Sequence, residues 1–275
     1  MPTDAKPKGL RGLLALPNED PRKLVTVAIA LCLVCSLAVS SAAVLLKPLQ
    51  EKNAALAIKR EILKVADLLQ PGQRQDVEAL FADRVETRIL DLASGELTDM
   101  DPASFDQRKA ARDPATSVAI PPTEDIARIR SRAKYAPVYL VRERGKIERI
   151  VLPVRGSGLW STMYGLLALA SDGRTIKGMT FYEQGETAGL GAEIESPKWL
   201  AEWQDKLAFD DQGHVRFEVV KGAVDSASPD ARYQVDGLAG ATLTSNGVTN
   251  LVRYWLGENG FGPFLDKFRT EGAKT

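Results

Sequence analysis

The chain has 275 residues with 36 basic and 36 acidic side chains, so its formal net charge is zero. This balance argues against a nucleic-acid partner, which usually requires a basic face or stripe. The chain has one histidine, His214, and two cysteines, Cys32 and Cys35, both inside an apolar run. Residues 47–275 therefore hold no disulfide framework and no thiolate metal site, which disfavours zinc enzymes, cysteine nucleophiles and histidine-based triads. Redox chemistry there would require a bound cofactor.

A run of 23 uncharged, mostly apolar residues extends from Leu24 to Leu46. A helix of this length spans a bilayer at 1.5 Å per residue. A cleavable signal peptide is the alternative, because Ser and Ala occur near residues 38–43. However, apolar residues continue past any plausible cleavage site, which favours an uncleaved transmembrane helix that anchors the chain in the lipid bilayer. Basic residues precede the run, so the positive-inside rule places residues 1–23 in the cytoplasm and residues 47–275 outside it.

The scarce cysteine and histidine side chains each allow two interpretations. Cys32 and Cys35 form a C-x-x-C pattern on one face of the predicted membrane helix. They are either a metal or redox ligand shared with a partner or, as we favour, two small apolar residues that pack in the helix. His214 opens a predicted strand beside Gly213. We interpret it as a surface turn residue rather than a ligand.

Downstream of the anchor, short helices and strands follow one another in the sequence. An apolar stripe predicts a helix over residues 51–69, ended by Pro71-Gly72. Two β-type runs flank Glu143–Lys146 and predict a hairpin. The order of the elements favours an α+β fold of antiparallel strands with flanking helices. The elements are a helix near 75–83, a strand at 85–92, a surface loop at 98–123, the hairpin strands at 137–142 and 147–154, an apolar run at 159–170, a strand at 176–182, a helix from Pro197 to about Leu207, a strand at 214–220, a helix ending at Leu256 and a packed tail at 261–268.

One short stretch, Asp236–Ser245, combines small residues with hydroxyls just before an amphipathic helix. Thr244, Ser245 and Asn246 are suitable N-cap residues. Thr242 is then expected just ahead of a helix N-terminus, where free backbone N–H groups and the helix dipole favour a negative charge. The pattern indicates a hydroxyl beside a phosphate site. The alternative is a glycine-rich turn that caps a helix and binds nothing.

Three glycine-rich segments are candidates for one shared site: residues 156–161, 186–191 and 238–242. Glycine lets backbone N–H groups approach a planar ligand closely and adopts positive φ where a turn needs it. Trp160 and the neighbouring leucines offer apolar surface to an aromatic ring system. Each segment alone is weak evidence, because glycine turns are common, but the three together favour a ligand site.

These segments read GSGLWS, E-T-x-G-L-G from Glu186, and D-x-x-x-G-A-T from Asp236 to Thr242. Together with the N-terminal span they resemble the FMN-binding domain family of extracytoplasmic flavin subunits, and within it the C subunit of the sodium-translocating NADH:quinone reductase. The resemblance covers nearly the whole chain. It implies FMN attached by a phosphoester to the last Thr of an S/T-G-A-T motif, which is Thr242 here. The chain departs from that motif at Ala239, and Thr244 is the alternative hydroxyl.

The resemblance also implies the rest of the site, with no catalytic side chain and no metal. Trp160 is expected to pack beside the flavin ring. Glu186 and Thr187 are expected to orient the second segment and to contact flavin or phosphate, unless Glu186 is simply a solvated loop acid. The full cofactor-binding set comprises Gly158, Leu159, Trp160, Ser161, Glu186, Thr187, Gly189, Leu190, Gly191, Gly240, Ala241 and Thr242.

In function, the resemblance implies a membrane-anchored flavoprotein, part of an oxidoreductase in the bacterial inner membrane that oxidises NADH, reduces ubiquinone and transports sodium. The flavin domain is expected in the periplasm. This chain has no dinucleotide fingerprint and a single span, so NADH oxidation and ion transport are assigned to other membrane subunits. A flavin transferase would attach the FMN. The alternatives are the flavin subunit of an Rnf-type ferredoxin:NAD oxidoreductase and a non-redox, membrane-anchored assembly or binding module.

Overall fold

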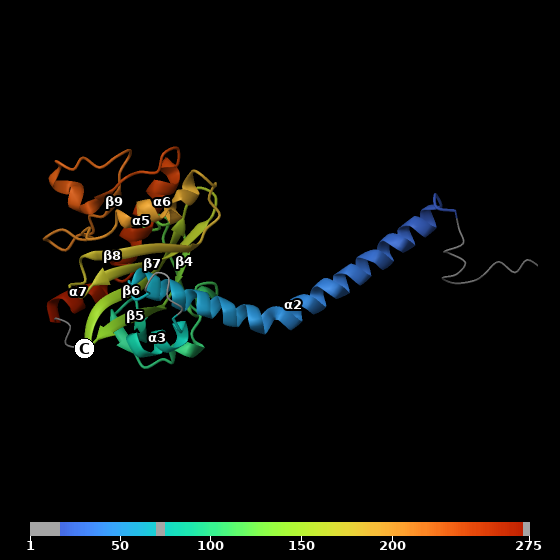
Figure 1. The fold of residues 1–275 in the computed structure, drawn as a ribbon, viewed down its shortest axis with the longest axis horizontal. Coiled ribbons are helices and arrows are strands. Elements are labelled where there is room, and N and C mark those ends of the chain that lie inside the picture. The colour runs from blue at the N-terminus through green and yellow to red at the C-terminus, as the bar shows by residue number, and fades with distance from the viewer. Residues whose placement is uncertain (1–16, 70–74, 272–275) are drawn as a thin grey trace, which may run out of the picture. The chain divides into compact units, whose positions relative to one another are not determined.

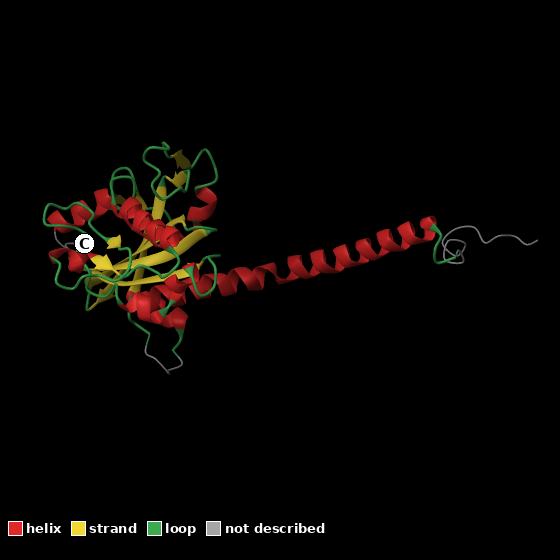
Figure 2. Ribbon diagram, turned by 90° about the horizontal axis from the view of Figure 1, so that it is seen from above, coloured by secondary structure: helices red, strands yellow, loops and turns green. Residues whose placement is uncertain are grey.

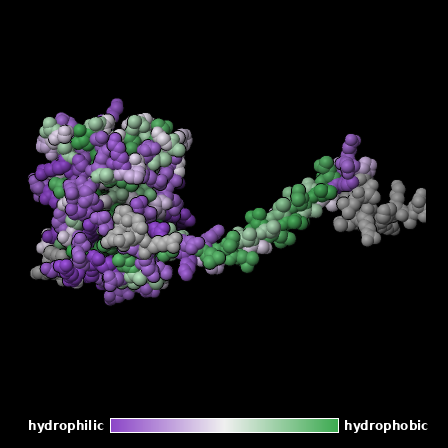
Figure 3. All heavy atoms as spheres, viewed as in Figure 1, coloured by the Kyte–Doolittle hydropathy of each residue, from purple (hydrophilic) through white to green (hydrophobic). Residues whose placement is uncertain are grey.

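The computed structural model describes residues 17–69 and 75–271, in two units that divide between Ala55 and Leu56. Helix α2 (Pro21–Val65, 45 residues) runs across that division. In the first unit its apolar side chains are exposed, Leu45 to 76% and Leu37 to 68%, and Figure 3 shows them along the helix. It is the one helix of the described residues that is long and apolar enough to cross a membrane. Cys32 and Cys35 are exposed on it as free thiols.

The second unit is built on a six-stranded sheet in the order β2-β1-β5-β6-β7-β8, in which every neighbouring pair is antiparallel (Figure 1). The predicted hairpin is present: β5 and β6 pair from Tyr139↔Val151 to Glu143↔Lys146. Arg144 and Gly145 between them both have positive φ, as a tight two-residue hairpin turn requires. The strands are β1 (Val85–Asp91), β2 (Glu96–Thr98), β5 (Tyr135–Glu143), β6 (Lys146–Ser157), β7 (Thr162–Ala170) and β8 (Ile176–Glu183).

Helices cover both faces of this sheet (Figure 2). In β6, Ile150 and Leu152 face one hydrophobic cluster and Val151 faces the other, as the two-residue period of a strand dictates. The larger cluster includes side chains of α5 (Pro197–Ala201), α6 (Thr242–Leu256) and α7 (Gly262–Glu271). The smaller one holds the end of α2 and α3 (Val77–Arg84). The fold is therefore α+β, as predicted.

The segment at residues 98–123 is more ordered than the predicted surface loop. The carboxylates of Asp101 and Asp106 accept backbone N–H groups at the start of two short helical turns, so these two aspartates are N-caps. A short strand then pairs with a later one in a separate two-stranded sheet. The elements are a 3-10 turn at Pro102–Ser104, α4 (Gln107–Ala110), β3 (Ser117–Ala119) and β4 (Ser131–Ala133).

Three further predictions need correction. The helix from Pro197 ends at Ala201 instead of Leu207, because the fully buried Trp203 turns into the core and stacks on Phe217 at 4.3 Å between ring centroids. The strand predicted at 214–220 is shorter in the structure: it is β9 (Glu218–Val219), which pairs in parallel with β10 (Gln234–Val235). The tail forms helix α7. The predicted stop at Pro71-Gly72 lies outside the described residues, and α2 ends at Val65.

Candidate functional site

Helix α6 begins at Thr242, and no side chain caps it. Its N-cap is Ala241, so the prediction of an N-cap at Thr244, Ser245 or Asn246 is wrong. The reason is that the hydroxyls of Thr244 and Ser245 have other partners. Thr244 donates to Glu186 at 2.6 Å, and Ser245 accepts the N–H of Leu238 at 3.1 Å.

Thr242 is consequently the first residue of the helix, and it is exposed. The N–H groups of the first turn of a helix have no partner within the helix, and here no side chain replaces one. Gly240, just before the helix, has φ +70°, which brings the chain to the helix start through a left-handed turn that suits glycine. The arrangement presents a hydroxyl beside free N–H donors and the positive end of the helix dipole, which together suit an anionic group.

The carboxylate of Glu186 joins the first two glycine-rich segments to helix α6, which begins at Thr242, the last residue of the third segment. It lies on the second segment and is only 8% exposed. It accepts the backbone N–H groups of Leu159, Trp160 and Ser161, each at 3.0 Å, from the first segment. It also accepts the hydroxyl of Thr244 at 2.6 Å from the first turn of α6, two residues after the third segment ends. The structure thus brings the three segments together, as the sequence indicated, and excludes the interpretation of Glu186 as a solvated loop acid.

Burial alone would raise the pKa of the Glu186 carboxyl, because a low-dielectric surrounding disfavours charge. The hydrogen bonds from Thr244 and from the three backbone N–H groups outweigh burial and hold its pKa below the ordinary value. Glu186 is therefore an ionised, fully engaged carboxylate at neutral pH, whose oxygens are directed at the protein itself.

Two glycines of the predicted site leave room for this carboxylate. A Cβ added at Gly158 would lie 2.5 Å from Oε1 of Glu186. A Cβ added at Gly191 would lie 2.7 Å from the hydroxyl oxygen of Thr244 and 2.9 Å from Cβ of Glu186. By contrast, a Cβ at Gly189, where φ is +73°, would meet nothing within 4 Å. Gly158 and Gly191 thus serve close packing, whereas Gly189 serves the turn of the exposed loop.

Four large apolar side chains remain exposed on these segments, and we call them the apolar rim: Leu159 (46% exposed), Trp160 (72%), Leu190 (43%) and Leu243 (59%). Leu243 is adjacent to Thr242 in the sequence. Leu190 approaches the third segment, since its Cδ2 would lie 2.9 Å from a Cβ at Gly240. Exposed apolar side chains gathered around one site are typical of ligand or partner contacts.

The remaining predicted residues shape the backbone of the segments. The exposed Thr187 accepts the N–H groups of Leu190 and Ala192 through its carbonyl, both at 3.1 Å, which folds the second segment. The hydroxyl of Ser161 accepts the N–H of Gly185 at 2.7 Å and links the first two segments. Ala241 is buried at the start of α6.

Sequence reasoning missed how the third segment is held in place. Asp236 accepts the indole N–H of Trp199 through its carbonyl and the N–H of Val224 through its carboxylate, both at 2.8 Å. Its own N–H donates to Glu202 at 2.9 Å. The aspartate of the D-x-x-x-G-A-T pattern was the available signal, although its partners lie 12 to 37 positions away in the sequence.

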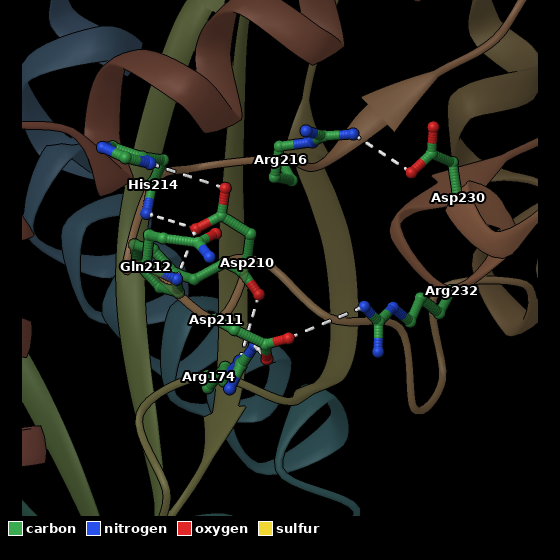
Figure 4. A network of polar contacts seen from close by, with 9 residues as sticks. Arg174, Asp210, Asp211, Gln212, His214, Arg216, Asp230 and Arg232 are labelled. Carbon is green, nitrogen blue, oxygen red and sulfur yellow. Dashed lines mark hydrogen bonds and ion pairs between the residues drawn. The ribbon is translucent and has the colours of Figure 1, made fainter.

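His214 is part of an exposed polar network (Figure 4). Its Nδ1 is 3.5 Å from Asp210, whose carboxylate also accepts the His214 backbone N–H at 2.9 Å. Arg174 and Arg232 pair with Asp211 nearby, at 2.5 and 4.0 Å. His214 is thus a surface turn residue, as predicted. Within residues 17–69 and 75–271, no three His, Cys, Asp or Glu side chains are grouped to hold a metal ion.

Comparison with known proteins places this geometry in a family. The family model described as FMN-binding domain matches residues 158–257, which include residues 158–161 of the first segment, the whole second and third segments, and α6. The C subunit of the Na(+)-translocating NADH-quinone reductase of Yersinia pestis is 51% identical over 258 residues, 93% of this chain and 96% of that protein. The corresponding protein of Pseudomonas aeruginosa is 49% identical over 254 residues, 92% of this chain and 97% of that protein.

Solved structures agree with the sequence comparison. The crystal structure of NqrC from Shewanella oneidensis matches with a TM-score of 0.71 and 38% identity, over 78% of this chain and 96% of that one. The C subunit of the Na(+)-translocating NADH-quinone reductase from Parabacteroides distasonis matches with a TM-score of 0.62 and 27% identity, over 80% of this chain and 96% of that one.

Proposed function

This chain belongs to the C-subunit family of the Na(+)-translocating NADH-quinone reductase, and from that membership we propose that it carries electrons through FMN attached as a phosphoester to Thr242. The chain is a flavoprotein subunit of an oxidoreductase complex with an FMN-binding domain. The single observation that supports covalent attachment is the exposed Thr242 at the uncapped start of the 15-residue helix α6.

The chemistry of the helix start fits the phosphate of FMN. A phosphodiester on Thr242 is anionic and would accept hydrogen bonds from the free first-turn N–H groups. Interaction with the helix dipole stabilises such an anion by about 0.3–1 kcal/mol, more where the site is partly buried. Thr244, the alternative hydroxyl, is 1% exposed and donates to Glu186, so it is not accessible to a transferase. Ala239 is exposed, and we expect attachment at Thr242 to tolerate it.

The residues of this chain have distinct roles in the proposal. FMN supplies the one-electron chemistry. The apolar rim is suited to pack against the flavin ring and to exclude water from it, with Trp160 as its largest surface. Glu186 is a positioning residue, because its carboxylate oxygens are occupied by backbone N–H groups and by the hydroxyl of Thr244. It fixes the first segment and α6 relative to each other and does not itself contact the flavin.

The proposal extends to the membrane and to partner proteins. Residues 24–46 anchor the chain in lipid as a single span, residues 1–23 lie in the cytoplasm and residues 47–275 form a periplasmic flavin domain. The exposed apolar stretch of α2 supports the anchor. Other subunits of the complex oxidise NADH and translocate sodium, and a flavin transferase attaches the FMN.

The test is co-expression of the full chain with a flavin transferase, followed by a denaturing gel viewed under ultraviolet light. We expect a flavin-fluorescent band that is lost in Thr242→Ala and kept in Thr244→Val. A band that survives in Thr242→Ala and disappears in Thr244→Val would move the attachment to Thr244. A colourless, non-fluorescent wild-type chain would contradict the flavin proposal and favour a non-redox assembly module.

A further inference from the structure

A loop beside the site presents two arginines in an unusual backbone conformation. Arg128 and Arg130 have φ values of +54° and +63°, and they are two of the five non-glycine residues with positive φ in the described part of the chain. A left-handed residue that carries a side chain costs about 1 kcal/mol, so the surroundings must hold it in place. The carboxylate of Asp125 does so by accepting the N–H groups of Ile129 at 2.9 Å and Arg130 at 2.7 Å. We call residues 125–130 the arginine loop.

The arginine loop is fastened to the first glycine-rich segment. The N–H of Ser157 donates to the carbonyl of Ala127 at 2.9 Å, and its hydroxyl donates to the carbonyl of Arg128 at 3.1 Å. Ser157 directly precedes Gly158, and Leu159 and Trp160 of the apolar rim follow. The backbone of the arginine loop is therefore tied to the segment that carries Leu159 and Trp160 of the apolar rim.

Both arginine side chains are exposed, and among the described residues the structure gives neither guanidinium a hydrogen bond or an ion pair. Arginines of the exposed network in Figure 4, such as Arg174 and Arg216, do have carboxylate partners, at 2.5 and 3.1 Å. The surrounding stretch, residues 107–134, has seven Lys and Arg against three Asp and Glu in a chain of zero net charge. Ile126 adds a 43% exposed apolar side chain to the loop.

We propose that the arginine loop docks on an acidic surface of a neighbouring protein subunit of the reductase, the one that exchanges electrons with the flavin. This inference rests on the proposed flavin at Thr242. Arginine and tryptophan are enriched in the energetically dominant positions of protein interfaces, and here the arginine loop is bonded to the segment that carries Trp160. Charge complementarity beside a redox centre accelerates productive encounter and fixes its orientation.

The geometry favours a protein carboxylate over a lipid headgroup. Lipid surfaces are usually bound by clusters of four to eight flexible Lys and Arg residues next to a membrane helix. The arginine loop offers two guanidinium groups on a backbone held by Asp125. A pre-organised guanidinium suits bidentate pairing with a carboxylate.

The most direct experiment is zero-length cross-linking in the assembled, full-length complex. Arg128→Lys and Arg130→Lys keep the charge and supply an amine that carbodiimide joins to any contacting carboxylate. Peptide mass spectrometry should find these lysines linked to Asp or Glu of another subunit. The matched control is Arg144→Lys, which is also exposed and left-handed (φ +50°) but lies in the β5–β6 turn, at the opposite end of β6 from Ser157. Links absent from both loop variants, or equally frequent in the control, would overturn the proposal.

Charge reversal supplies the functional readout. In the complex, Arg128→Glu combined with Arg130→Glu should slow NADH-driven quinone reduction about tenfold, whereas Arg144→Glu with Lys146→Glu should leave it unchanged. NADH oxidation with an artificial acceptor and flavin fluorescence on the chain should be unaffected in both. An unchanged rate in the reversed loop variant would contradict the docking role.

Two further outcomes separate the possible failures. If the rate loss appears in vesicles rich in anionic lipid but vanishes in neutral phosphatidylcholine vesicles, the loop contacts lipid and the protein-docking proposal is wrong. If the wild-type chain carries no flavin fluorescence, the proposed flavin function fails. If the Arg128→Glu, Arg130→Glu chain is fluorescent and quinone reduction proceeds at the wild-type rate, only the docking proposal is refuted.

Discussion

Two acidic sites of the domain, Glu186 and the pair Asp210 and Asp211, differ in how the fold uses them. Glu186 is buried and accepts hydrogen bonds from Leu159, Trp160, Ser161 and Thr244, so that one carboxylate joins the first two segments to helix α6. The cluster around Asp210 and Asp211 in Figure 4 is exposed and pairs with arginines on the surface.

The difference shows where an ionic group determines structure. An exposed ion pair gains little, because water and salt screen it and two flexible side chains must be ordered. A buried carboxylate with every oxygen engaged is different, since its removal leaves several donors without partners in a place that water reaches poorly. We therefore expect the architecture of the flavin site to depend on Glu186 and to be indifferent to the exposed cluster.

The largest effect is expected for Glu186→Ala. It leaves three backbone N–H groups and the Thr244 hydroxyl without an acceptor, which should cost about 3 kcal/mol. Thermal unfolding of the full chain in detergent should show a Tm lower by about 8 °C. Glu183→Ala is a matched control, because that neighbour is exposed and its carboxylate pairs with Arg108 at 2.7 Å on the surface. Equal Tm values for the two variants would contradict the proposed role of Glu186.

A smaller loss is expected for Gly191→Ala, whose methyl group would enter the space taken by Thr244 and Glu186. Overpacking of this kind costs about 2 kcal/mol. Gly189→Ala meets no neighbour and bears only the penalty of its left-handed backbone, about 1 kcal/mol. Flavin incorporation should fall in Gly191→Ala and persist in Gly189→Ala, as in-gel fluorescence would show. The reverse order would be inconsistent with a packed centre at Glu186.

The ionisation of Glu186 predicts a pH dependence of stability. Its pKa is lower in the folded chain than the ordinary value of about 4.3, so its charge stabilises the fold above that value. This contribution is lost as the pH falls through the folded-state pKa. The Tm difference between wild type and Glu186→Gln should thus be constant from pH 6 to 8 and shrink below about pH 4. A Tm difference that grows on acidification would mean that the fold is stabilised more by the neutral Glu186 carboxyl than by the ionised one.

The smallest effect is expected in the exposed cluster. Asp211→Asn removes the partner of Arg174 and Arg232, but water replaces it readily. Flavin incorporation should equal that of wild type, and any change in Tm should disappear in 0.5 M salt. A large, salt-independent loss would show that the exposed cluster and Glu186 are less different than their burial indicates.

Local patterns predicted the sheet and helix framework well. The β5–β6 hairpin follows from strand periodicity around Arg144-Gly145, and helix α6 follows from the apolar face that includes Val248 and Leu251. These features depend on neighbours in the sequence. The α5 boundary was wrong because burial of Trp203 against Phe217, 14 positions away, overrides the local helical pattern.

The site was predicted in part for the same reason. The motifs identified the three segments and placed Thr242 near a helix start. They did not reveal that Thr244 and Ser245 leave the cap empty, because their partners Glu186 and Leu238 are 58 and 7 positions away. The role of Glu186 as a joint between segments likewise depends on tertiary contacts that no local pattern encodes.

Peptide mass spectrometry of the full chain, co-expressed with a flavin transferase, tests the central claim most directly. We expect the peptide containing Thr242 to gain the mass of FMN less one water, with fragment ions that assign the addition to Thr242. The same peptide in Glu186→Ala should carry less of it. An unmodified Thr242 in a chain that retains its fold, or an addition located at Thr244, would contradict the account.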